Sequence, residues 1–83
     1  MKLGFVGIII EGDRSVSMQV QSILAENSSI IIGRMGLPNC EENVFMITLG
    51  VKGTNEQISA LTGRLGRIKN VKVKSAVSDV EVK

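Results

Sequence analysis

The first part of the chain places an apolar run before a segment with helical spacing. Residues 3–10, LGFVGIII, are apolar throughout, which is typical of a strand covered on both faces for part of its length. Gly12 then permits a tight turn, and Asp13 or Ser15 can cap a helix. The next apolar residues predict an amphipathic helix of about 13 residues that residues 27–29 end. They are Val16, Val20, Ile23 and Leu24.

The apolar pattern after residue 29 predicts two strands, a second helix and a final strand. One strand begins at residues 30–32, III, and another spans residues 44–52, VFMITLGVK, with apolar residues on both faces. We expect Gly36 and Pro38 to shape the turn between these two strands. In residues 71–77, VKVKSAV, two lysines alternate with valines, as on a strand with one wet face or at an exposed edge.

The second helix is predicted to begin with a capping box. Thr54 and Gln57 have the T-x-x-Q spacing, in which side chains satisfy the free amides of a helix start. Gly63 and Gly66 each cost this helix about 1 kcal/mol, and we expect close packing against a neighbouring element to explain them. Asn70 tolerates the left-handed conformation that a turn from helix to strand often requires. The apolar helix face consists of Ile58, Leu61, Leu65 and Ile68.

The predicted order of elements is β-α-β-β-α-β, in a single domain of residues 1–83. With right-handed crossovers this order gives an α+β, ferredoxin-like fold, a four-stranded antiparallel sheet with both helices on one face. The strands at 3–10 and 44–52 are nevertheless apolar on both faces. A bare aliphatic face on a small monomer would be a large sticky patch. We therefore expect a second subunit to cover it, or strands that continue across an edge into a neighbour.

Composition supports assembly and removes several kinds of site. A domain of 83 residues buries only roughly 60% of the surface that its unfolded chain exposes, so we expect support from a homo-oligomer, either dimer or tetramer. The single cysteine makes no disulfide within the chain, and without histidine there is no zinc set. We expect no metal, no cofactor and no membrane span. One unpaired cysteine and no export signal indicate the cytoplasm.

Residues 33–43, GRMGLPNCEEN, gather the most chemically notable side chains of the chain. Arg34 and the amides near Gly33 and Gly36 would suit an anion, since arginine donates in a fork that fits carboxylate or phosphate. The alternative is a strand end with its connection, and the spacing of a P-loop is absent. Cys40 is followed by two glutamates, which do not favour the thiolate of a reactive cysteine. We expect an inert surface thiol.

No pattern in the sequence indicates catalysis. Glu11 and Asp13 have no partner histidine, nucleophile or metal set, so a turn and a helix cap explain them better. The chain has no recognisable nucleophile–base pair. We therefore expect no catalytic residue and no enzyme activity.

Basic residues crowd the last third of the chain, with no acid among them. Such a cluster suits nucleic-acid phosphates, but no aromatic residues are interleaved for single strands and no DNA-reading motif is present. The alternative is a cationic helix C-terminus, favoured by the helix dipole, followed by a lysine-guarded strand. The candidates are Arg64, Arg67, Lys69, Lys72 and Lys74.

Two segments and the order of elements resemble a known family. The run Gly33-Arg34-x-Gly36-x-Pro38 with EEN at 41–43, and ISALTGRLGRIKNVKVK at 58–74, are similar to the iron-only hydrogenase system regulators. These are small stand-alone ACT-like proteins, and the resemblance spans nearly the whole chain. It implies a fold close to the C-terminal domain of nickel-responsive repressors, assembly through the sheet, and regulation. The nickel-binding histidines and the DNA-reading arm of those repressors have no counterpart in this sequence.

The resemblance also implies a ligand loop. ACT domains that bind amino acids do so near the loop between the first strand and first helix, at a subunit interface. The matching positions are Glu11, Gly12, Asp13 and Arg14. The first hypothesis is therefore a regulatory module that oligomerises through its sheet and senses a small-molecule effector or transmits assembly to a protein partner. The alternatives are a structural assembly domain with no ligand, and an accessory transcriptional regulator whose weak DNA contact needs a partner.

Overall fold

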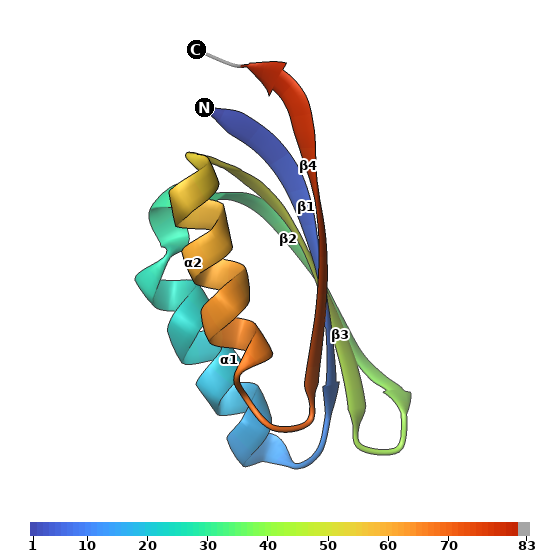
Figure 1. Cartoon of the computed structure of the whole chain (residues 1–83). Coiled ribbons are helices and arrows are strands. Elements are labelled where there is room, and N and C mark those ends of the chain that lie inside the picture. The colour runs from blue at the N-terminus through green and yellow to red at the C-terminus, as the bar shows by residue number, and fades with distance from the viewer. Residues whose placement is uncertain (82–83) are drawn as a thin grey trace.

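The computed structural model describes residues 1–81. Over these residues two α-helices lie on one face of a four-stranded antiparallel sheet (Figure 1). The strand order β2-β3-β1-β4 is that of the predicted ferredoxin-like, ACT-like fold, which is confirmed. The elements are β1 (Lys2–Glu11), α1 (Arg14–Glu26), a 3-10 turn η1 (Ser28–Ile30), β2 (Ile31–Glu41), β3 (Val44–Gly53), α2 (Asn55–Gly66) and β4 (Val71–Glu81).

The core lies between the sheet and the helices. Side chains alternate between the two faces of a strand, so every second residue of β1 and β3 points toward α1 and α2. Leu61 of α2 and Leu49 of β3 are fully buried where these layers meet. The core is aliphatic, as the near absence of aromatic residues requires. It consists of Val6, Ile8, Ile10, Val20, Leu24, Ile30, Ile47, Leu49, Val51, Ile58, Leu61, Leu65 and Val71.

The helix starts are capped as the sequence predicts. The Asp13 carboxylate accepts from the Ser15 hydroxyl at 2.6 Å and from the Ser15 amide at 3.0 Å. These bonds hold the pKa of Asp13 below its ordinary value, and the bond from the Ser15 hydroxyl has the larger effect. At α2, the Gln57 amide donates to the Thr54 hydroxyl at 3.1 Å, and the Thr54 amide donates to Gln57 Oε1 at 2.9 Å. The predicted capping box is confirmed.

Three turns meet at the C-terminal end of β1. Asn70, between α2 and β4, adopts the predicted left-handed conformation with a φ of 71°, and Asn43 does the same between β2 and β3 with 58°. Glu11 donates its amide to the Asn70 carbonyl at 2.8 Å, and Gly12 donates to the Asn43 carbonyl at 2.9 Å. The β1–α1 loop is therefore held by backbone bonds on two sides.

The connection between β2 and β3 differs from the prediction. Gly36 and Pro38 do not shape a turn, because both lie inside β2, and the chain reverses after Glu41 at the left-handed Asn43. Proline is found within sheets mainly in edge strands, and β2 is an edge strand. The pairing of β2 with β3 also shifts between Leu37 and Glu41. Edge position and irregular pairing let a strand continue through residues that usually mark a turn.

The glycines of α2 also differ from the prediction. We expected Gly63 and Gly66 to pack closely against a neighbour, yet both are exposed. No described atom outside the local helix backbone lies within 4 Å of the place where a Cβ of either would be. Gly66 is the last residue of α2, so its cost to the helix interior is small. The structure offers no packing reason for Gly63.

Candidate functional site

The sheet face opposite α1 and α2, called here the outer face, carries exposed large apolar side chains from two strands, β1 and β2. Phe5 of β1 is 69% exposed, and Ile32 of β2 is 63% exposed. Met35 and Leu37 of β2 and Ile9 of β1 are also exposed. A contiguous apolar area of this kind on a small protein marks an interaction surface more often than a solvated one. The sequence predicted this face from the apolar residues at both parities of β1 and β3.

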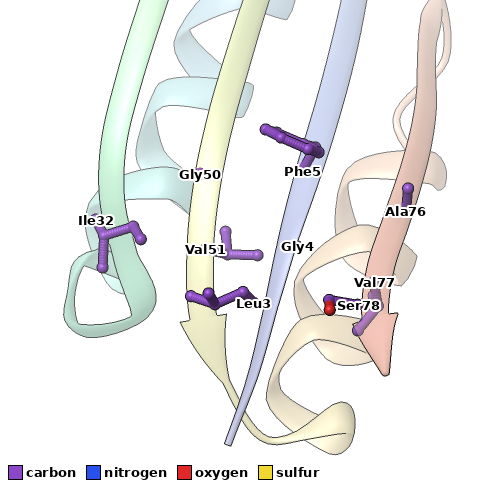
Figure 2. A pocket seen from close by; sticks show the side chains of 9 residues that line it. All are labelled: Leu3, Gly4, Phe5, Ile32, Gly50, Val51, Ala76, Val77 and Ser78. Atoms are coloured by element: carbon purple, nitrogen blue, oxygen red, sulfur yellow. The ribbon is translucent and has the colours of Figure 1, made fainter. Parts of the chain in front are cut away.

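A hollow of about 480 Å³ lies in the outer face, and we call it the Gly50 hollow. Figure 2 shows Phe5 and Ile32 on strands to either side of Gly50. A Cβ added at Gly50 would be 3.5 Å from the Ile32 side chain, which is ordinary contact. The hollow thus exists because a glycine takes the place of a side chain between two large ones. Its lining is almost entirely apolar, so an apolar group would fit it best.

Arg34 lies away from the outer face, where β2 runs beside α1. Its guanidinium donates to Gln21 Oε1 of α1 at 2.6 Å, and both side chains are exposed. Arg34 lines a hollow of about 300 Å³, and Gln21 lines another of about 310 Å³. Gly33 lines the first hollow and Gly36 the second, and neither would meet a described atom within 4 Å through an added Cβ. We call these two hollows with their Arg34–Gln21 bond the α1–β2 groove.

The structure does not bring the loop of residues 11–14 next to Arg34. Gln21, the partner of Arg34, follows Arg14 by about two turns of α1, or about 10 Å along the helix axis. The loop itself is occupied with structural bonds through the Glu11 and Gly12 amides and the Asp13 cap. That this loop binds a ligand stays a prediction.

The basic residues of the last third do not form one surface. Arg64 of α2 pairs with Glu26 of α1 at 2.6 Å on the helix side of the sheet. Lys72 and Lys74 of β4 lie on the outer face, and Lys72 is 4.0 Å from Glu11. The sheet thus separates the helical arginines from these lysines. Arg67 and Lys69 lie at and after the end of α2. That these residues contact nucleic acid stays a prediction.

The remaining chemistry of the described residues is sparse. Cys40 is exposed, and its Sγ lies 3.1 Å from the Leu37 carbonyl as a weak donor. Among the described side chains no group of three or more His, Cys, Asp or Glu residues could hold a metal ion. No helix within the described part of the chain is long and apolar enough to cross a membrane.

Comparison with protein families gives a match over most of the chain. The TM1266-like family model, described as "Iron-only hydrogenase system regulator, putative", matches residues 2–75. The chain belongs to this family. The structure of the uncharacterized protein TM1266 from Thermotoga maritima is 36% identical, with a TM-score of 0.87. That similarity covers 92% of this chain and 95% of the other. The predicted resemblance is confirmed.

More distant structures share the fold alone. The ACT domain from the GTP pyrophosphokinase of Chlorobium tepidum is 15% identical with a TM-score of 0.75, over 92% of this chain and all of that domain (100%). The PII-like protein CPII from Thiomonas intermedia, bound to ADP, AMP and bicarbonate, is 14% identical with a TM-score of 0.55. That similarity covers 99% of this chain and 98% of CPII. No curated protein matches the chain.

Two residues of the candidate sites were missed from the sequence. Gln21 was not among the predicted site residues, although it is the partner of Arg34. Gly50 was noted only as one of the residues of its strand, although it forms the floor of the Gly50 hollow. A glycine between large apolar residues in a central strand was the available signal for Gly50. No local signal pointed to Gln21, because its partner is distant in the sequence.

Proposed function

We propose that the chain is a small cytoplasmic regulatory module of an iron-only hydrogenase system, which assembles through its outer face and responds to a small effector. The family match and the ACT-like fold support a regulator rather than an enzyme. The observation that carries assembly is the outer face, where Phe5 and Ile32 are largely exposed around an apolar hollow. Burial of this apolar area is the driving force that a second subunit would supply.

The α1–β2 groove is our candidate for the effector site. Arg34 offers a planar, permanently charged donor to a carboxylate or phosphate. Its bond to Gln21 lies between exposed groups, so an anion could replace the neutral amide as the stronger, charge-assisted partner. Gly33 and Gly36 leave the adjacent backbone accessible. The effector would therefore be a small molecule with an anionic group, such as an amino acid or a nucleotide.

A thermal-shift screen of amino acids, nucleotides and metal ions tests the proposal. An anionic effector should raise the melting temperature saturably, by linkage to the folded state. Arg34→Ala should abolish that rise, whereas the control Arg67→Ala, which removes another exposed arginine outside the groove, should keep it. A blank screen would favour the alternative, an assembly domain without a ligand. A rise that survives Arg34→Ala would place the effector elsewhere, with the loop of residues 11–14 next to be tested.

A further inference from the structure

Two neighbouring rows of the outer face each pair a side chain with a glycine. The antiparallel pairing sets each residue of β1 directly opposite one of β3. Phe5 is opposite Gly50, and Gly7 is opposite Thr48. Figure 2 shows the first of these pairs, with the Phe5 ring beside a strand position that has no side chain. The face therefore carries a projection and a recess at the same level of neighbouring strands.

A closed two-fold interface requires a patch that is complementary to itself. Consider a two-fold axis that runs along the strands between β1 and β3, in the plane midway between two stacked sheets. This operation puts β1 of each copy over β3 of the other without changing the level. Phe5 then lies over the partner's Gly50, in the Gly50 hollow of about 480 Å³, and Thr48 lies over the partner's Gly7. In these two rows a side chain meets a glycine, and one row further along Ile9 meets Met46 of the partner.

The edge strands match under the same operation, because β4 of one copy then covers β2 of the other. Lys72 pairs with Ile9, and Leu37 lies at the same level through Met46 of β3, so Lys72 of one copy covers Leu37 of the other. In the same way Lys74, at the level of Gly7, covers Met35 of the partner. Lysine stems pack well on apolar side chains while their ammonium groups extend beyond them. Glu41 follows Leu37 by four residues and pairs with Val44, which places it at the level of Glu11, one outer-face row beyond Ile9. The basic edge strand β4 and the acidic end of β2 are therefore complementary in charge.

The outer face is large enough for a stable dimer. Four strands of the described sheet at a spacing of about 4.8 Å, each about 10 residues at 3.3 Å, make a face of about 19 by 33 Å. The flat area of about 600 Å² understates the accessible area, because side chains roughen it. A standard interface buries about 800 Å² on each partner. Stacking of the two faces would thus bury at least about 1,200 Å² in total, which is the lower end of the standard range.

We propose that the partner on the outer face is a second copy of this chain, stacked about that two-fold axis, with Phe5 of each copy seated over Gly50 of the other. This inference rests on the proposed function, of which it specifies the assembly. Phe5 is the anchor of the interface, because it is the most exposed large apolar side chain of the face and enters a preformed apolar recess.

Light scattering after size exclusion, with a dilution series for the dissociation constant, tests this arrangement. Phe5→Ala removes the projection, and Gly50→Val fills the recess from a Cβ that would be at ordinary contact distance from Ile32. Each should raise the dissociation constant of the face at least about 30-fold, the factor of a hot-spot residue. Met18→Ala is the control, because Met18 is 64% exposed but lies on α1. Far-UV circular dichroism checks that every variant is folded.

An equal mixture of Phe5→Ala and Gly50→Val chains is the decisive measurement. In the mixed pair, the intact Phe5 of one chain meets the intact Gly50 of the other, and the alanine meets the filled recess. The mixture should therefore regain much of the association that each variant lacks alone. Association of both variants as tight as that of Met18→Ala, or no recovery in the mixture, would overturn the arrangement alone. A monomeric wild-type chain at micromolar concentration would overturn the proposed assembly as well.

Discussion

The substitution Gly53→Ala should destabilise the fold, although alanine usually stabilises relative to glycine. Gly53 is buried at the end of β3, and a Cβ there would be 2.8 Å from Gln57 Oε1 and 3.2 Å from the Ile30 side chain. Gln57 cannot move aside freely, because its Oε1 accepts the Thr54 amide in the capping box. The new methyl group must therefore break that bond or push Ile30 within the core.

The magnitude follows from three terms. Loss of one hydrogen bond costs about 1 kcal/mol, and overpacking typically costs about 1–3 kcal/mol. The reduced entropy of the unfolded chain returns about 0.4–1 kcal/mol. We expect Gly53→Ala to lower the free energy of unfolding by about 1–3 kcal/mol. The matched control is Gly63→Ala, at an exposed helical position with an open Cβ site, which should raise it by up to about 1 kcal/mol.

Urea unfolding followed by far-UV circular dichroism measures both variants. The chain has no tryptophan or tyrosine to report by fluorescence. All chains must be compared at one protomer concentration, because association adds to the apparent stability. In a Gln57→Ala background the 2.8 Å contact is gone, so Gly53→Ala should cost less there. If Gly53→Ala stabilises the chain as Gly63→Ala does, the steric reasoning is refuted.

Three further substitutions test the core, a surface ion pair and a helix cap. Leu61→Ala removes a fully buried side chain and should lower the free energy of unfolding by about 2–5 kcal/mol in urea titration; a loss below 1 kcal/mol would contradict its place in the core. Glu26→Gln breaks the exposed pair with Arg64 and should cost under about 1 kcal/mol, less still in high salt. The lowered pKa of Asp13 contributes stability above its ordinary value of 3.8. That contribution disappears as pH falls through the lower folded pKa, so the melting-temperature advantage over Asp13→Asn should shrink from pH 5 to pH 2; a constant difference would argue against the cap.

Much of the fold could be predicted because its signals are local. Apolar spacing depends on neighbouring positions, and it gave the order of the elements and the face of α1 that holds Val20 and Leu24. The capping box at Thr54 and the left-handed turn at Asn70 depend on a few adjacent residues, and both were predicted. The apolar outer face was also visible in advance, since the parity of a residue in a strand is set by its position alone.

The tertiary structure alone decided the features that depend on which distant segments meet. Edge position let β2 continue through Pro38, and the sheet separates Arg64 from the lysines of β4. The bond from Arg34 to Gln21 joins residues on elements that no local pattern pairs. Phe5 lies beside Gly50 because of the long-range pairing of β1 with β3. A slip of that pairing by one residue would separate the two positions. Local sequence thus determined the elements and their apolar faces, whereas the candidate sites exist only because packing sets the register between strands and helices.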